Sequence, residues 1–286
     1  MRLIIVSGLS GSGKSVALHM LEDIDFYCVD NIPAALLKPF ISHTVRGMGD
    51  TYPRTAVGLD ARNRPNEIET IPALVGELRR SGIDCEVLYL HAADEVLLKR
   101  YAETRRKHPL VAGDVSLREA IASERRLLEP ISNAADLVID TSRMGVHALR
   151  EMIRERIDRR RDGRLCLMFE SFGYKYGIPG DADFVFDVRS LPNPYWDHAL
   201  RPLNGRDAPV IEYLAGQAGV RDMIADLIGF LDRRVVEFEQ VNRSYLTIAV
   251  GCTGGQHRSV YVAERLAQHF RKSYPQVLTR HDALSR

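Results

Sequence analysis

The sequence contains few cysteines, and their spacing excludes the usual cysteine-based sites. There are four in 286 residues, and no two of them form a C-x-x-C pair. We therefore expect neither a zinc site nor a disulfide framework, and a reducing cytoplasm fits this use of cysteine. The four are Cys28, Cys85, Cys166 and Cys252.

Long apolar runs and a strong net charge are also missing. No segment approaches the apolar length of a membrane span, and the first residues lack the charged and apolar regions of a secretory leader, so we expect neither. The formal net charge is +1, yet basic residues gather at 154–164 and from Arg258 onward. Apolar residues make up 45% of the chain, as in a globular protein with one large domain or two smaller ones.

A glycine-rich loop near the N-terminus carries the clearest chemical signal. Residues 8–15 read G-x-x-x-x-G-K-S; the apolar run 3–6 precedes them, and apolar residues at helical spacing follow. In such a strand–loop–helix context, backbone N–H groups and the helix N-terminus surround the phosphates of a nucleotide. Lys14 would reach the β- and γ-phosphates, and the Ser15 hydroxyl would bind Mg²⁺. A glycine-rich turn without a ligand is the alternative, which the flanking pattern disfavours. The predicted nucleotide-binding residues are Gly8, Leu9, Ser10, Gly11, Ser12, Gly13, Lys14 and Ser15.

Two further strand-like runs end in polar residues. Asp30 follows the run 26–29, where it would either join the Mg²⁺ shell or cap the helix that begins at Pro33. Residues at the carboxyl ends of parallel strands face the ligand crevice, so those after the run 55–59 are candidate ligand contacts, with ordinary loop residues as the alternative. They are Asp60, Ala61, Arg62 and Asn63.

A helix-like segment that begins at Ala93 ends in a double arginine. It resembles the segment that folds over ATP phosphates in small-molecule kinases, with Arg100 and Arg105 as the phosphate-facing candidates. The alternative is a solvated basic helix end that complements the helix dipole.

Strand-like and helix-like patterns alternate from residue 1 to residue 158. This alternation predicts an α/β fold, with a parallel sheet covered by helices on both faces as in kinases with a phosphate loop. The arginine-rich run 159–164 is the predicted linker. Residues 165–286 are predicted to form a second, smaller α/β domain with an anion-binding loop and a basic tail.

A second glycine-rich loop, residues 251–259, lies between a strand-like and a helix-like segment. Five residues separate Cys252 from Arg258, a spacing that resembles the anion loop of cysteine-dependent phosphatases. Backbone N–H groups, Arg258 and the helix dipole would converge on one phosphate, and the same field would favour the Cys252 thiolate. We interpret the loop as an anion-binding site; a phosphatase with Cys252 as nucleophile and a purely structural turn are the alternatives.

The last helix-like segment is basic. From Arg258 to Arg286 there are six Lys and Arg residues against two acidic ones, a net charge of +4. A basic helix and tail beside an anion loop is compatible with RNA binding, although such a run is often only a solvated face. The candidate RNA-binding residues are Arg265, Arg271, Lys272, Arg280 and Arg286.

Five motifs together resemble the RapZ family of bacterial nucleotide-binding proteins, over essentially the whole chain. They are GLSGSGKS (8–15), FYCVDN (26–31), YAETRRKHPL (101–110), FESFG (169–173) and GCTGGQHRS (251–259). The resemblance implies binding of ATP and GTP with Mg²⁺, at the phosphate loop and at residues 60–63. It also implies that the C-terminal domain senses the phosphosugar glucosamine-6-phosphate, with candidate contacts at Asp187, Arg189, Asn193, Thr253, Gly254, Gly255, His257 and Arg258.

Enteric members of this family bind small regulatory RNA through their basic C-terminal part and present it to endoribonuclease E, which tunes amino-sugar synthesis. Here the chain after Tyr274 has basic residues without a dense lysine–arginine cluster, a departure from that pattern. The resemblance nevertheless predicts a regulatory adapter that forms a homo-oligomer and is not primarily an enzyme, although weak ATPase or GTPase activity is compatible with it. The alternative is a small-molecule kinase or nucleotide hydrolase without an RNA role. A kinase needs an acceptor site and a general base, and the sequence alone identifies neither.

Overall fold

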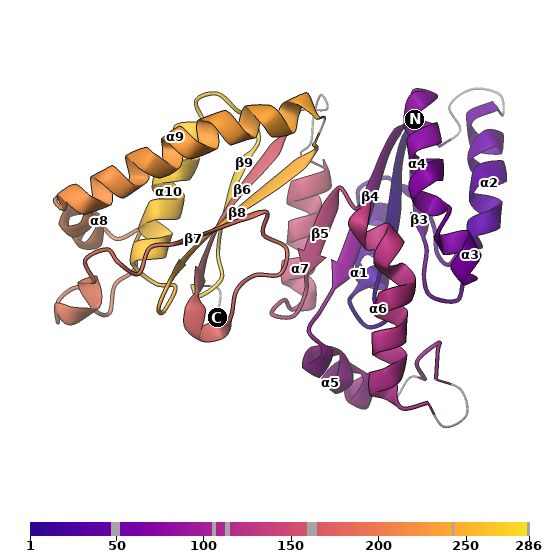
Figure 1. The fold of residues 1–286 in the computed structure, drawn as a ribbon, viewed down its shortest axis with the longest axis horizontal. Helices are drawn as coiled ribbons and strands as arrows, with labels where there is room; N and C mark the ends of the chain where they lie inside the picture. Colours follow the sequence, from indigo (N-terminus) through magenta and orange to yellow (C-terminus); the bar gives the residue numbers. More distant parts are fainter. Residues whose placement is uncertain (47–51, 105–106, 112–114, 159–164, 242, 285–286) are drawn as a thin grey trace. The chain divides into compact units, whose positions relative to one another are not determined.

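The computed structural model describes residues 1–46, 52–104, 107–111, 115–158, 165–241 and 243–284 (Figure 1). The chain divides into two compact units, Met1–Asp158 and Arg159–Arg286. The predicted linker, 159–164, lies outside the described residues. Among the residues described, no helix is both long and apolar enough to cross a membrane.

A five-stranded parallel sheet forms the centre of the N-terminal unit. Its strands run in the order β2-β3-β1-β4-β5, so the first strand of the chain lies in the middle and pairs on both sides. Leu3 of β1, for example, lies opposite Thr55 of β3 and Cys85 of β4. The strands are β1 (Arg2–Gly8), β2 (Tyr27–Val29), β3 (Arg54–Gly58), β4 (Asp84–His91) and β5 (Leu137–Asp140).

Helices cover both faces of this sheet (Figure 1). On one face, α1 (Lys14–Asp23) packs against β1, β2 and β3 and against α7 (Val146–Ile153). On the other, the core joins Leu3, Val57 and Val87 of the sheet to apolar side chains of the remaining helices. Those helices are α2 (Ala34–Arg46), α3 (Pro65–Ile68), α4 (Ile71–Arg80) and α6 (Leu117–Asn133), while α5 (Asp94–Thr104) packs on α6.

The C-terminal unit has its own four-stranded parallel sheet, in the order β7-β8-β6-β9. Its core joins Phe169, Ile248 and Val250 of the sheet to Leu231 of the long helix and Leu266 of the last one. The elements are β6 (Cys166–Gly173), β7 (Phe184–Asp187), α8 (Ala208–Ala215), α9 (Ala218–Gln240), β8 (Tyr245–Cys252), α10 (Arg258–Phe270) and β9 (Val277–His281).

The predicted fold class is confirmed: both units are α/β, and the phosphate-binding motif follows the central strand of the first. Three elements have no counterpart in the sequence prediction, because they are short and their apolar spacing is weak. They are α3, α8 and β9. The last of these matters for function, because the predicted basic tail contains an edge strand that pairs with β6.

Candidate functional site

The phosphate loop connects the end of β1 to the start of α1, and its glycines are required by geometry. Gly8 has a φ of +142°, and a Cβ there would lie 2.1 Å from the Leu90 carbonyl oxygen. Gly13 precedes α1 with a φ of +106°, in the left-handed region that favours glycine. The loop is also tied to the sheet, because the Leu9 N–H donates to the Leu90 carbonyl at 3.0 Å.

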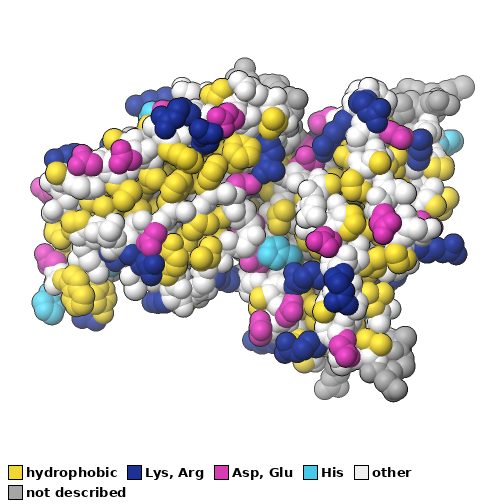
Figure 2. Space-filling view, in the orientation of Figure 1, with side chains coloured by type: hydrophobic (Ala, Val, Ile, Leu, Met, Phe, Trp, Pro, Cys, Tyr) yellow, Lys and Arg dark blue, Asp and Glu magenta, His cyan; other side chains and the backbone are white. Residues whose placement is uncertain are grey.

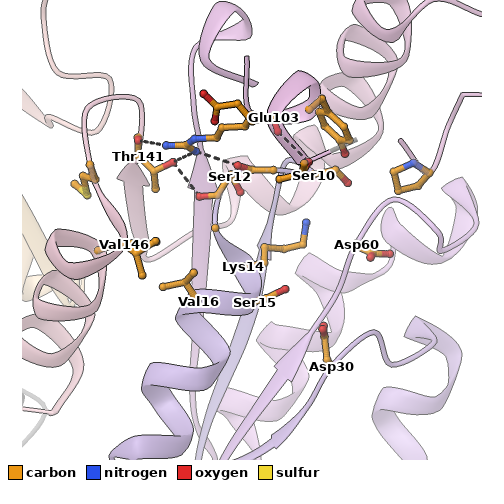
Figure 3. Close-up of a pocket in the computed structure, with 18 of the residues that line it drawn as sticks. Ser10, Ser12, Lys14, Ser15, Val16, Asp30, Asp60, Glu103, Thr141 and Val146 are labelled. Atoms are coloured by element: carbon orange, nitrogen blue, oxygen red, sulfur yellow. Dashed lines mark hydrogen bonds between the residues drawn. The ribbon is translucent and has the colours of Figure 1, made fainter. Parts of the chain in front are cut away.

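A cavity of about 550 Å³ opens over this loop (Figure 3). Its lining differs from end to end: Lys14 lies between Val16 and Val146 on one side and Asp60 on the other. The volume falls within the range of small-molecule and cofactor sites. An apolar end, a loop of backbone N–H groups and a carboxylate end match the base, phosphates and metal of a nucleotide.

The ammonium group of Lys14 is held at the loop. Its Nζ donates to the Gly8 carbonyl oxygen at 2.7 Å. Burial lowers the pKa of Lys14, and the nearby carboxylates of Glu124, Asp60 and Asp30 offset part of that effect. The side chain therefore combines a desolvated cation with surrounding carboxylates, a setting in which interaction with phosphate oxygens is strong.

Asp60 is the carboxylate on the strand next to the loop. Because β3 lies between β1 and β2, Asp60 follows the strand that pairs with β1, whereas Asp30 follows the next strand out. Asp60 Oδ1 accepts from the Arg62 N–H at 2.9 Å. When the Asn31 amide is oriented to satisfy both Asp60 and Arg62, its nitrogen donates to the same Asp60 oxygen at 3.1 Å. The Asn63 amide donates to the Asp60 carbonyl at 3.1 Å.

The residues at this end of the cavity fit Mg²⁺. Ser15 and Asp60 both line the cavity and supply the hard oxygen ligands that Mg²⁺ prefers. In the part of the chain that is described, no group of three or more His, Cys, Asp or Glu side chains could hold a metal alone. Mg²⁺ in nucleotide sites needs only one or two protein ligands beside phosphates and water, so this donor set suffices.

A buried triad supports the loop from behind. Glu124 of α6 accepts from the Ser10 N–H at 2.9 Å and from the Ser10 hydroxyl at 2.7 Å. His108 Nε2 lies 3.0 Å from the same carboxylate, and the side chains of both His108 and Glu124 are 0% exposed. The Leu110 N–H donates to His108 Nδ1 at 3.1 Å, so the ring proton resides on Nε2 and is donated to Glu124. No pattern in the sequence predicts this triad, because Ser10 and Glu124 are 114 residues apart.

Arg100 braces the loop from another side. Its guanidinium donates to the Gly11 carbonyl at 2.9 Å and to the Thr141 carbonyl at 2.6 Å. The Thr141 hydroxyl in turn donates to the Ser12 carbonyl at 2.9 Å (Figure 3). Arg100 lines the cavity but is engaged with backbone carbonyls, which differs from a freely phosphate-facing role. The other candidate, Arg105, lies outside the described residues.

The second loop lies at the N-terminus of α10. The Gly255 N–H donates to Cys252 Sγ at 3.2 Å, and Ser259 Oγ lies 3.2 Å from the same sulfur. Arg258 is only 5% exposed, and its Nη1 donates to the carbonyls of Arg189 and Leu191 at 2.7 and 3.0 Å. Among the described residues its Nε is buried without a hydrogen-bond partner. Nη1 of the guanidinium thus holds a neighbouring turn, while Nη2 lies 3.5 Å from the Thr253 hydroxyl of the loop.

Four other predicted phosphosugar contacts lie in three different environments. Asp187 and Arg189 lie beside Arg258 but pair with each other at 2.7 Å. The Asn193 amide oxygen instead accepts from the Tyr195 N–H at 3.4 Å and caps a short turn. His257 is buried against the Leu200 carbonyl; burial lowers its pKa, which leaves Arg258 as the cation of the loop.

The predicted RNA-binding residues are distributed unevenly. Lys272 and Arg271 are exposed, the latter with Glu264 at 4.0 Å, and Arg265 donates to Gln268 on the same helix. Arg280 belongs to β9, is mostly covered and pairs with Asp282 at 3.0 Å. Positive and negative groups alternate on the face shown in Figure 2 without merging into one basic field. Arg286 lies beyond the described residues.

Comparison with known proteins gives matches along the whole chain. The model of the RapZ-like N-terminal domain matches residues 1–161, and that of the RapZ C-terminal domain matches residues 165–285. A nucleotide-binding protein of Alkalilimnicola ehrlichii is 52% identical over 289 residues, which cover 100% of this chain and 99% of its own. One of Nitrosococcus oceani is 53% identical over 100% of both chains. Shikimate kinase from Bacteroides thetaiotaomicron, a solved structure, is 14% identical over 55% of this chain and 98% of its own, with a TM-score of 0.38.

Proposed function

The chain belongs to the RapZ family, and from this premise we propose that it is a regulatory adapter. In this proposal the N-terminal unit binds ATP or GTP with Mg²⁺, and the C-terminal unit senses glucosamine-6-phosphate. The same unit binds small regulatory RNA, which a homo-oligomer presents to endoribonuclease E. The observation that carries the proposal is the phosphate loop with Lys14, Ser15 and Asp60 around one cavity.

The N-terminal site supports a nucleoside triphosphate with its phosphates on residues 8–15. Lys14 would exchange its bond to the Gly8 carbonyl for phosphate oxygens, and Ser15 and Asp60 would hold Mg²⁺. Mg²⁺, when bound, would neutralise phosphate charge. The apolar end at Val146 and Leu149 would cover the base. Glu124 and Arg100 keep the loop in shape for this ligand.

Calorimetric titration with ATP and with GTP in the presence of Mg²⁺ tests the nucleotide site. Replacing Lys14 by Ala should weaken both nucleotides by about 30-fold or more, since a lost charged partner costs roughly 2–5 kcal/mol. Lys99→Ala is the matched control, because Lys99 is exposed on α5 and lies outside the cavity. Equal affinities in wild type and Lys14→Ala would refute the site.

The C-terminal loop supports a phosphate ligand. The N–H groups after Thr253 and the start of α10 favour an anion, and the Arg258 guanidinium supplies a cation whose Nη2 makes, among the described residues, only a 3.5 Å contact, with the Thr253 hydroxyl. Titration with glucosamine-6-phosphate tests this site. We expect Arg258→Lys to lose the planar fork and weaken binding at least tenfold, whereas Arg233→Ala on α9 should not.

Cys252→Ser separates a sensor from a phosphatase. A binding loop does not need a thiolate, so binding should change little and no phosphate should be released by either protein. Phosphate release that disappears in Cys252→Ser would make this unit an enzyme and contradict the sensor proposal.

Crosslinking followed by RNA sequencing from the native cell tests the adapter role. Discrete bound RNAs, recovered together with endoribonuclease E, are the expected result. Recovery of no RNA above the level of an Arg271→Ala, Lys272→Ala double variant would contradict the adapter role, while the titration above tests the nucleotide site separately.

A further inference from the structure

A second cavity adjoins the phosphate cavity in the N-terminal unit. It has a volume of about 410 Å³ and opens between the segments that follow β2 and β3. Arg62 lines both cavities, whereas the other lining residues of the second one do not line the first. These others are Asn31, Pro33, Asn63, Arg64 and Glu67.

The boundary between the two cavities is built from hydrogen-bonded polar groups. Asp60 lines the phosphate cavity and accepts two hydrogen bonds, from the Asn31 amide at 3.1 Å and from the Arg62 N–H at 2.9 Å. The Asn31 side-chain oxygen accepts from Arg62 Nη1 at 3.2 Å. Asn31 has a φ of +53°, in the left-handed region that Asn adopts more readily than most other non-glycine residues. A ligand in the second cavity would therefore face the phosphate end of the first across this boundary.

The frame of the second cavity is fixed by the sheet. The Ile32 N–H donates to the Gly58 carbonyl at 3.1 Å, and the Ala34 N–H donates to Asn63 Oδ1 at 2.6 Å. Asn63 is only 8% exposed, so this contact is shielded from water. The cavity is thus formed by residues that the fold holds in place, as expected of a binding site.

The charged side chains of the lining favour a small anion. Two guanidinium groups, Arg62 and Arg64, and one carboxylate, Glu67, line the cavity, and planar guanidinium forks match carboxylate or phosphate oxygens. The Asn31 and Asn63 amides are hydrogen-bonded within the protein and hold the polar wall of the cavity in place. The volume suits a metabolite rather than a polymer.

We propose that the second cavity is the acceptor site for phosphoryl transfer from a nucleoside triphosphate to a small hydroxylated carboxylate or phosphate ester. This activity goes beyond the adapter role and rests on the nucleotide site proposed above. Asp30 lines the phosphate cavity, and the next residue, Asn31, lines the second cavity. Asp60 is already engaged by Asn31 and Arg62, so Asp30 is the general base.

The acceptor hydroxyl oxygen forms a bond to the γ-phosphorus, and the bond from that phosphorus to the β–γ bridging oxygen breaks. The nucleoside diphosphate leaves with the electron pair of the broken bond. The hydroxyl proton passes to the Asp30 carboxylate and then to water. Arg62 and Arg64 hold the anionic group of the acceptor so that its hydroxyl points across the boundary.

The test uses the full chain, Mg²⁺ and ATP labelled in the γ-phosphate, together with a deproteinised small-molecule extract of the native cell. The expected result is label in a phosphorylated small acid, which is then purified and its precursor used as the substrate. Asp30→Asn should lower the transfer rate at least about 100-fold, the lower end of general-base effects. Arg64→Ala should raise the KM of the acceptor at least tenfold and leave the ATP affinity unchanged, because Arg64 lines only the second cavity.

Arg80→Ala is the matched control, because Arg80 is exposed on α4 and lines neither cavity. Label that appears only in inorganic phosphate would show hydrolysis and overturn the acceptor site. Equal acceptor KM values for Arg64→Ala and Arg80→Ala would also overturn it. A wild-type chain that binds no ATP would refute the nucleotide site itself, a failure that calorimetry distinguishes from the other two.

Discussion

The carboxylate of Glu124 holds both the backbone N–H and the hydroxyl of Ser10, at 2.9 and 2.7 Å. A residue of helix α6 therefore fixes the third residue of the phosphate loop from beneath. His108 donates to the same carboxylate, which links the loop to the segment that follows α5. The loop conformation depends on this buried group as well as on its own glycines.

The Glu124 contact predicts a specific dependence of stability on pH. Burial alone would raise the pKa of Glu124, but hydrogen bonds from His108 and Ser10 and the charge of Lys14 outweigh it and hold the pKa below its usual value of 4.5. A carboxyl whose pKa is lowered by folding contributes stability above its unfolded pKa, and this is lost as the pH falls through the folded value.

Glu124→Gln should therefore reduce the free energy of unfolding by about 1–3 kcal/mol at pH 7 and by less as the pH falls below 4.5. Urea unfolding at about pH 7, 5, 4 and 3.5 measures the difference. Glu129→Gln, exposed on the same helix, is the control. A destabilisation that stays constant across this range would show that charge on Glu124 is not responsible.

Replacement by alanine should affect stability very differently at two adjacent glycines of the C-terminal loop. Gly255 has a φ of +74°, and a Cβ there would lie 2.6 Å from the Gly173 nitrogen, whereas a Cβ on Gly254 would meet nothing within 4 Å. We expect Gly255→Ala to cost about 1–3 kcal/mol of stability and to abolish phosphosugar binding, while Gly254→Ala changes stability by less than about 0.5 kcal/mol. Thermal unfolding and ligand titration of both variants check this; similar losses in the two would contradict it.

The exposure and pairing of the basic residues after α10 predict which of them contact RNA. Lys272→Ala and Arg271→Ala should each reduce the slope of log affinity against log salt by about 0.7–0.9, one phosphate contact each. Arg280→Ala should change the slope less, because Arg280 pairs with Asp282 at 3.0 Å and with Glu170 at 3.9 Å. Filter binding across a salt series measures the slopes, and an Arg280→Ala effect as large as that of Lys272→Ala would contradict this ranking.

The sequence predicts local features well and distant pairings poorly. The loop at residues 8–15 is recognisable because strand, glycines and helix are contiguous. The order β2-β3-β1-β4-β5 is a property of non-local pairing, so the sequence could not show that Asp60 rather than Asp30 lies on the strand next to the loop. Glu124 and Ser10 are 114 residues apart, and no short motif connects them.

Non-local contacts likewise limit what the sequence shows about the C-terminal loop. Its spacing marks Arg258, but the carbonyls of Arg189 and Leu191 that one nitrogen binds come from a turn 69 and 67 residues away. A one-dimensional motif identifies a cation without showing which of its donors are already engaged.

The edge strand β9 has a consequence for any shortened form of this chain. Residues 277–281 pair with Leu167–Ser171 of β6, so a protein ending before Val277 would lose a border of its sheet and not merely charge. The bared peptide groups of β6 would then offer a template to other chains. Weakened RNA binding by such a shortened protein could therefore result from self-association as well as from the loss of arginines. Single-residue charge changes separate these two causes at this end of the molecule.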